Sequence, residues 1–304
     1  MHSRKRFTVF LSSSHSVTHG AWSYGPNVIE VGGLNIKEAK PLPQDLQQFM
    51  DSASNGVILI SFGSALTPSQ MKQEKLNMII GMFRTLKQYS FIWKCDAKID
   101  NLPDNVRILN WLPQQVCKER YQSICLYPRS SFLQDLIAHP NLKVFVTHGG
   151  IGSLTEAIYH KATLVGIPFA QDQKPNLIRA EKNGYAILLD YGTITEEIIT
   201  SAVQKAMESP EMAAALERVH NLYTDREMKP AEKATWWIEY VCRNGMEAGK
   251  MLKPIFSDVP WYQYHHLDTI LILVIVLGGL IGISVSLCRC CLRCCCNRKK
   301  EKEE

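Results

Sequence analysis

A strand, a glycine-rich turn and a helix start follow one another in one short stretch, and this order constrains the fold more than any other feature. The stretch runs from Phe145 to Glu156 and reads FVTHGGIGSLTE. Its apolar start predicts a buried strand, and its glycines let the backbone approach a ligand closely. We expect Ser153 to cap a helix over 154–159, whose free N–H groups would bind a phosphate. His148 ends the predicted strand, where open α/β sheets bind ligands. An ordinary strand-to-helix turn with a buried histidine is the alternative.

Short apolar strands alternate with amphipathic helices along most of the chain. This alternation predicts an α/β fold with a Rossmann-like, doubly wound parallel sheet. The further strands are expected over 56–61, 91–94, 106–109, 163–166 and 186–189, and the helices over 45–51, 70–87, 175–183, 195–207, 212–223 and 231–243.

The charge balance and the cysteines exclude two classes of protein. The net charge is only +5, with 34 basic and 29 acidic residues, and no stripe of lysine and arginine with interleaved aromatics indicates nucleic-acid binding. Six of the ten cysteines lie between Cys288 and Cys296, so they do not form a disulfide framework through the folded body.

Two further motifs lie on either side of the central stretch. The upstream motif, Trp111 to Gln114, reads WLPQ, and the downstream motif, Gly166 to Gln173, reads GIPFAQDQ. Together with the central stretch they resemble the signature of the UDP-glycosyltransferases, specifically the animal UDP-glucuronosyltransferase type. The intervals between His148, Glu156 and Asp172 also match that family. The resemblance implies the C-terminal half of a GT-B fold.

The resemblance also implies a reaction. A hexosyl group would pass from a UDP-sugar to a small lipophilic acceptor, with inversion at the anomeric carbon. UDP leaves, so positioned N–H groups and a helix N-terminus would neutralise the developing diphosphate charge without a metal ion. The implied co-substrate is UDP-glucuronate or UDP-glucose. Gly152 stands where vertebrate members often have asparagine, which leaves the choice of sugar open.

By the same resemblance, residues of three loops bind the two ends of the UDP-sugar. Trp111 would stack on the uracil, and Gln114 would lie near the base and ribose. The loop at Ser64 would border the nucleotide sugar. Asp172 and Gln173 would bind the hydroxyl groups of the sugar. The structural alternatives are a core tryptophan, a plain strand-to-helix turn at Ser64 and a turn aspartate.

The middle of the UDP-sugar would meet the central stretch. His148, Gly150 and Ser153 would face the diphosphate. Glu156 would bind the ribose, since a carboxylate accepts hydrogen bonds from both hydroxyls of a diol. The alternative for Glu156 is an acidic residue that the helix dipole stabilises near a helix start.

Residues 116–134 interrupt the resemblance. Without them the chain would read WLPQQDLIAHP, which matches the family. A valine codon begins with GT and a glutamine codon can be CAG, so we hypothesise a retained intron, and genomic codons of another kind at 116 and 134 would contradict it. A true loop insertion is the rival, because doubling a loop's length costs only about 0.6 kcal/mol in closure entropy.

The domain boundaries follow from the same comparison. Residues 1–25 form a leader that the sequence leaves unplaced, and a disordered or mis-assigned start is preferred to a signal peptide, whose apolar core would be too short. Residues 26–245 form the predicted UDP-sugar-binding domain, and 246–268 form a juxtamembrane segment.

Residues 269–287 carry no charge and suffice for a transmembrane helix, which needs about 20 residues. Trp261, Tyr262 and Tyr264 form an interfacial aromatic cluster before this segment, and several arginines and lysines follow it. Positive charge on the cytosolic side places the tail over 288–304 in the cytosol and the folded body in the lumen.

The end of the tail, residues 300–304, reads KEKEE and resembles the K-x-K-x-x retrieval signal of endoplasmic-reticulum membrane proteins. The expected location is therefore the endoplasmic reticulum membrane, and a charged, solvated end is the alternative. The tail cysteines are expected to be acylated or to have no role. A metal site at Cys291 and Cys294 lacks further ligands at a suitable spacing.

The family's catalytic base is a histidine supported by an aspartate, both in an N-terminal domain that the given chain does not contain. His15 and His19 lie in the unplaced leader, so no catalytic residue is assigned. We expect this chain alone to bind UDP-sugar weakly or not at all and to show no turnover, because a general base contributes typically 10²–10⁴-fold. The alternative is a membrane-anchored, non-catalytic partner that forms homo- or hetero-oligomers with full-length transferases.

Overall fold

The computed structural model divides the chain into two units. The first contains Phe10–Tyr24 and Val28–Arg243, and the second contains Met1–Val9, Gly25–Asn27 and Asn244–Glu304. The structure describes residues 9–63, 66–97, 99–109, 131–170, 172–253 and 259–300.

A six-stranded sheet forms the centre of the first unit, and all of its neighbouring strands are parallel. The strand order is β5-β4-β3-β6-β7-β8, so the chain builds outward from β3 in one direction and then from β6 in the other. The predicted doubly wound α/β sheet is therefore confirmed. The strands are β3 (Val57–Ser61), β4 (Ser90–Lys94), β5 (Val106–Leu109), β6 (Leu142–Thr147), β7 (Thr163–Gly166) and β8 (Ala186–Leu188).

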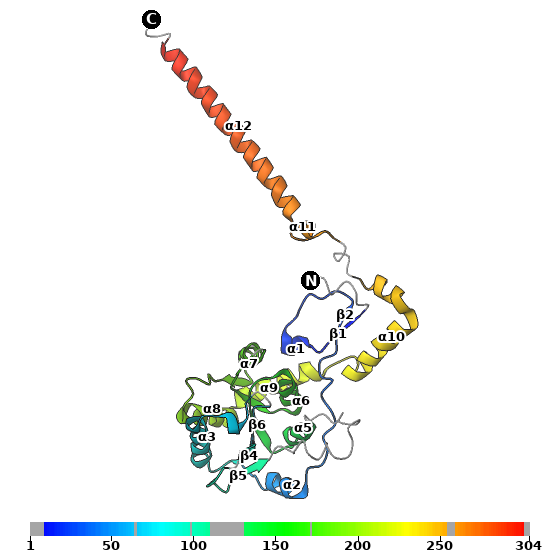
Figure 1. Ribbon diagram of the computed structural model, residues 1–304, viewed down its shortest axis with the longest axis vertical. Coiled ribbons are helices and arrows are strands. Elements are labelled where there is room, and N and C mark those ends of the chain that lie inside the picture. The colour runs from blue at the N-terminus through cyan, green and yellow to red at the C-terminus, as the bar shows by residue number, and fades with distance from the viewer. Residues whose placement is uncertain are drawn as a thin grey trace. The chain divides into compact units, whose positions relative to one another are not determined.

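Helices cover both faces of this sheet (Figure 1). One face carries α3 (Gln73–Thr85) and α8 (Glu196–Glu208). The other face carries α2 (Gln44–Asp51), α5 (Ser131–Ile137), α6 (Ile151–His160), α7 (Gln173–Lys182) and α9 (Pro210–Thr224).

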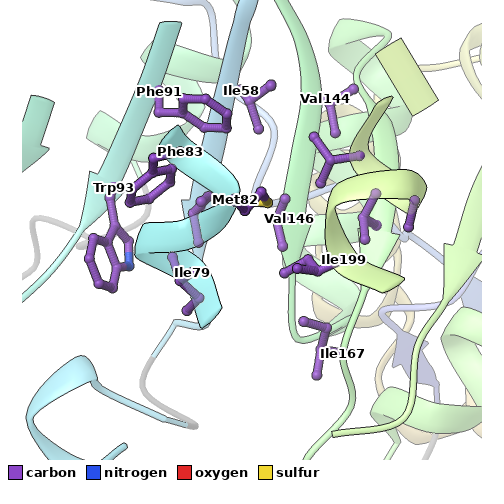
Figure 2. Close-up of a cluster of buried hydrophobic side chains, with 14 of the residues drawn as sticks. Ile58, Ile79, Met82, Phe83, Phe91, Trp93, Val144, Val146, Ile167 and Ile199 are labelled. Atoms are coloured by element: carbon purple, nitrogen blue, oxygen red, sulfur yellow. The ribbon is translucent and has the colours of Figure 1, made fainter. Parts of the chain in front are cut away.

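Alternate residues of each strand enter two different hydrophobic clusters, because successive side chains point to opposite faces. In β3, Ile58 and Ile60 join the cluster under α3 and α8, whereas Val57 and Leu59 join the opposite one. Figure 2 shows the first of these clusters, in which Met82 of α3 and Ile199 of α8 gather with Val146 of β6. Both faces are thus buried, as expected for a parallel sheet.

Most element boundaries lie within a few residues of those that the sequence predicts. Helix α3 begins later than expected because Pro68–Gln70 form a separate 3₁₀ turn, η2. Thr195 caps α8, since its hydroxyl oxygen accepts a hydrogen bond from the Ile198 N–H at 3.4 Å. Helix α10 (Pro230–Met251) extends past residue 243 and is broken by Gly245, whose φ is 57°.

The structure gives a place to most of the leader that the sequence left unplaced. Strand β1 (Phe10–Ser12) pairs in parallel with β2 (Val28–Glu30), and α1 (Ser16–His19) follows β1. Two arginines hold the backbone of this segment: Arg179 donates to the Thr18 carbonyl at 2.9 Å, and Arg226 donates to the Gly32 carbonyl. Residues 10–24 are therefore not a disordered start but part of the first unit.

Helix α5, which the sequence did not predict, begins inside the predicted insertion over 116–134. Its residue Gln134 is buried, and its Nε2 donates to the Lys37 carbonyl at 2.6 Å while its Oε1 accepts from the Lys37 N–H at 3.3 Å. Residues 116–130 lie outside the described part of the chain.

The second unit contains α11 (Trp261–Tyr264) and the long helix α12 (Leu267–Lys300). Residues Leu267–Cys290 of α12 are long and apolar enough to cross a membrane, with a mean hydropathy of 2.8 in the most apolar window and no burial against the rest of the chain. This span contains the predicted segment 269–287 and is slightly longer.

We expect Arg179→Met to loosen residues 10–24. The substitution keeps most of the side-chain stem but removes the hydrogen bond to Thr18, a contact from a charged donor worth about 1.5–3 kcal/mol. Hydrogen–deuterium exchange should become faster at the N–H groups of Val31 and Gly32, which donate to the carbonyls of Ser12 and Ser14. Lys182→Met, at an exposed position of the same helix, is the matched control, and equal exchange in both variants would contradict the prediction.

Candidate functional site

The predicted site residues that the structure describes gather at the carboxyl edge of the sheet, beside the point where the strand order reverses. His148 follows β6 directly, and Asp172 and Gln173 follow β7 after a short loop. Parallel α/β sheets bind ligands in the crevice at this edge and at this switch point. Ser64, Trp111 and Gln114 lie outside the described residues, so their predicted roles stay predictions.

The imidazole of His148 lies between two glycines that leave no room for a side chain. A Cβ at Gly150 would lie 2.6 Å from His148 Nε2, and a Cβ at Gly63 would lie 2.8 Å from His148 Cε1. Gly63 also has a φ of +61°, which favours glycine. Any larger residue at either position would therefore displace the histidine ring.

Burial lowers the pKa of His148 below its usual value, and the Asp172 carboxylate opposes this shift in part. The imidazole is therefore neutral at physiological pH and has one N–H group to donate. Its Nδ1 lies 3.4 Å from the Thr147 hydroxyl oxygen, which leaves Nε2 as the other nitrogen available to a ligand.

Helix α6 begins at Ile151, three residues earlier than the sequence predicts. Gly150 is its N-cap residue, in an extended conformation with φ −63° and ψ 146°, and no side chain caps the helix. The prediction that Ser153 is the cap was wrong, because Gly150 already ends the turn and Ser153 lies inside the first helical turn. The first N–H groups of α6 thus have no side-chain acceptor, which suits an anionic ligand.

A buried asparagine connects the turn after β6 to the loop after β7. Asn176 Nδ2 donates to the Gly149 carbonyl at 3.2 Å and to Asp172 Oδ2 at 2.9 Å. The exposed Asp172 carboxylate is therefore held in a defined position relative to His148 and the start of α6. The sequence analysis missed Asn176, although its position four residues after Asp172 on a helix was a usable signal.

Gln173 uses part of its side chain to shape the same loop. Its Oε1 accepts hydrogen bonds from the N–H groups of Phe169 at 2.7 Å and Ala170 at 3.0 Å. The side chain is 7% exposed. Because both lone pairs of the oxygen are used in this way, the amide NH₂ group is the part of Gln173 that can bind a ligand.

Glu156 is the most unusual ionisable group of the site. It is 3% exposed, and burial raises its pKa to about 7, although a hydrogen bond from Asn35 Nδ2 at 3.3 Å to Oε1 counters part of this shift. Asn35 also donates to Thr155 Oγ1 at 3.1 Å. A buried carboxylate with few donors around it is poorly solvated and has free capacity to accept hydrogen bonds.

One histidine–aspartate pair lies elsewhere in the described part of the chain. His139 Nε2 lies 3.1 Å from Asp51 Oδ1. The next residue but one, Asn141, accepts the Val57 N–H where β3 and β6 begin, so this pair lies at the amino edge of the sheet. It lies at the opposite edge of the sheet from His148.

Comparisons with known proteins identify a family and relatives that this chain resembles. A family model described as "UDP-glucoronosyl and UDP-glucosyl transferase" matches residues 18–119 and 127–302, and the break over 120–126 falls inside the predicted insertion. UDP-glucuronosyltransferase 2B18 of Macaca fascicularis is 34% identical over 88% of this chain and 46% of the relative. UDP-glucuronosyltransferase 2B15 of Homo sapiens is 33% identical over 91% of this chain and 48% of the relative. The chain thus spans about half the length of these relatives.

Solved structures share the fold at low sequence identity. The spinosyn forosaminyltransferase SpnP superimposes with a TM-score of 0.59 at 14% identity, over 77% of this chain and 55% of that structure. The glycosyltransferase VinC, solved in complex with DTDP, gives a TM-score of 0.50 at 18% identity, over 67% of this chain and 45% of that structure. These likenesses concern the fold alone.

We expect Glu156→Gln to stabilise the fold, and more so at high pH. Glu156 has its usual pKa of 4.5 in the unfolded chain and a pKa of about 7 in the folded state. The protonated group therefore supports the folded state fully below pH 4.5, and this support is lost as the pH rises to about 7. Above that pH the buried charge costs up to about 3 kcal/mol, at 1.36 kcal/mol per pKa unit.

Denaturant unfolding of the full chain in detergent at pH 5 and pH 8 would measure this difference. The gain from Glu156→Gln should be larger at pH 8. Glu74→Gln, at an exposed position of α3, is the control and should change little at either pH. A gain that does not depend on pH would contradict the expected ionisation of Glu156.

Proposed function

The chain belongs to the family of UDP-glucuronosyl and UDP-glucosyl transferases, and from this premise we propose that it binds the UDP-sugar of a glycosyl transfer reaction. One observation carries the proposal. At the carboxyl edge of the sheet, Asn176 links the turn that contains His148 and the uncapped start of α6 to the carboxylate of Asp172. These groups suit a diphosphate with a sugar attached to it.

In this proposal the N–H groups at the start of α6 and the neutral His148 bind the diphosphate. They gain strength as negative charge develops on the leaving UDP, which favours the transition state over the bound substrate. Gly150 is the N-cap residue that precedes these N–H groups, and its lack of a side chain leaves room for the His148 ring. Ser153, in the first turn of α6, would add a hydroxyl donor on the same side.

Glu156 would bind the ribose hydroxyls, and Asp172 and Gln173 would bind the hydroxyls of the sugar. The Glu156 carboxylate is buried with spare acceptor capacity, so two hydroxyl donors would replace the solvation it lacks. Asp172 would accept and the Gln173 NH₂ would donate, which gives the sugar one contact of each kind. Trp111, Gln114 and Ser64 would complete the nucleotide end.

We further propose that the acceptor is a small lipophilic molecule that receives the sugar with inversion. Activation of the acceptor requires a general base. Among the described residues, the histidine that forms an ion pair with an aspartate is His139, and it lies at the amino edge of the sheet rather than the carboxyl edge. The expectation that this chain alone shows no turnover therefore stands as a proposal. If the chain instead copurifies with an intact transferase, a role as a non-catalytic, membrane-anchored partner would be favoured.

We place the protein in the endoplasmic reticulum membrane, crossing once through α12. The body would lie in the lumen, where UDP-sugar would have to be supplied, and the tail would lie in the cytosol. Arginines and lysines after residue 288 support this orientation, and the K-x-K-x-x ending at residues 300–304 supports retrieval to the endoplasmic reticulum.

We expect UDP-glucose to bind the full chain more tightly at pH 8 than at pH 6. Only about a tenth of Glu156 is ionised one pH unit below a pKa of about 7, and the ionised form accepts the ribose hydroxyls best. UDP-glucose has no group that titrates in this range, unlike free UDP. Saturation-transfer NMR, which detects weak binding, should show a several-fold change in affinity.

Glu156→Gln should weaken binding at pH 8 and remove the increase with pH. Protonation of His148 at low pH would act in the opposite direction, so the variant isolates the contribution of Glu156. Binding that is undetectable in both proteins at both pH values would contradict the proposal that this chain binds UDP-sugar by itself.

We expect protease added to intact microsomes to remove a C-terminal epitope tag and to leave the body intact. Detergent should then expose the body to digestion. Protection of the tag before detergent is added would place the tail in the lumen and would contradict the proposed orientation.

A further inference from the structure

The cysteines at the end of α12 form a cluster that the proposed donor site does not use. Six cysteines lie between Cys288 and Cys296, and α12 runs as one helix through all of these positions to Lys300. Cys288 and Cys290 are described with their side chains, and both are exposed, free thiols.

The position of these two cysteines along the span is defined by the charges around it. The uncharged segment from Thr269 to Leu287 has 19 residues, which at about 1.5 Å per residue covers about 28 Å. The hydrocarbon core of a bilayer is about 30 Å thick. Cys288 and Cys290, on either side of Arg289, therefore lie where the hydrocarbon ends and the headgroups begin.

Other uses of these thiols do not fit the helix. Residues two positions apart on an α-helix point about 200° apart around its axis, so Cys288 and Cys290 cannot form a disulfide with each other. In the ranges that the structure describes, no group of three His, Cys, Asp or Glu side chains could hold a metal ion.

The other described cysteines differ in the features that matter. Cys95 is buried, its Sγ donates to the Ala97 carbonyl at 3.3 Å, and burial raises the pKa of its thiol. Cys242 is exposed in α10 but precedes the apolar span by more than twenty residues. Exposure and proximity to the membrane occur together at Cys288 and Cys290.

We propose that Cys288 and Cys290 are sites of reversible S-acylation, with a long-chain fatty acyl-CoA as the acyl donor. The proposal rests on the cytosolic orientation of the tail proposed above. Juxtamembrane cysteines are the usual acceptors of this modification. The positive charge of the adjacent Arg289 attracts the phosphates of coenzyme A.

The step is an exchange of one thioester for another. The cysteine sulfur, having lost its proton, attacks the carbonyl carbon of the acyl-CoA and forms a new carbon–sulfur bond. The bond between that carbon and the sulfur of coenzyme A breaks, and the leaving thiolate takes up a proton. Nothing is oxidised or reduced, and the acyl chain enters the leaflet beside α12.

Metabolic labelling of the full chain with an alkyne analogue of palmitate tests the proposal. We expect a label that neutral hydroxylamine removes, because hydroxylamine cleaves thioesters. The double variant Cys288→Ser/Cys290→Ser should lose most of the label. Cys242→Ser, the matched exposed cysteine away from the span, should keep all of it.

Three outcomes would overturn the proposal. They are no label on the full chain, a label that resists hydroxylamine, and a double variant that retains most of the label and loses it only when the cysteines at 291, 294, 295 and 296 are also replaced. Carbonate extraction of each variant would confirm that it is inserted in the membrane, so that loss of label reports acylation rather than loss of the protein.

The protease-protection measurement on the same membranes separates the proposal from its premise. A cytosolic tail without label refutes acylation and leaves the orientation intact. A luminal tail refutes both. UDP-glucose binding is measured on the other unit of the chain, so its result is independent of either.

Discussion

The register between β3 and β6 is the constraint on which the described site depends. Ser61, the last residue of β3, is paired with Thr147, the last residue of β6. Both strands therefore end at the same level, and Gly63 comes beside His148 just beyond the edge. The imidazole fits there because neither Gly63 nor Gly150 has a side chain. A slip of one residue in this pairing would turn the strand side chains to the wrong faces and separate the two loops.

Local sequence patterns predicted the sheet well. Runs of β-branched and aromatic residues such as those in β3 and β4 have no competing helical period, and their burial on both faces makes them continuous. Residues 10–24 escaped prediction because their order depends on distant partners. Strand β1 is only three residues long and is held by β2, and the following helix α1 is held by Arg179, which donates to the Thr18 carbonyl. A segment with so little local signal cannot be predicted from its own residues alone.

The site divides in the same way. His148, Glu156, Asp172 and Gln173 were predicted from the resemblance to a known family, and the structure describes each of them near the carboxyl edge, although their roles stay predictions. Asn35 reaches Glu156 across 121 positions, and no local pattern indicates such a contact. The start of α6 was misplaced because a serine is a common cap, whereas here the N-cap residue is Gly150, which has no side chain. The nucleotide end at Trp111 lies outside the described residues.

The buried amide of Gln134 has a consequence for the history of the chain. If residues 116–134 were removed, Gln115 would precede Asp135 and present the same amide to the Lys37 backbone. The long and the short chain would therefore make the same contact from equivalent glutamines. A messenger processed either way would therefore encode a glutamine at the position that anchors this helix to the Lys37 backbone.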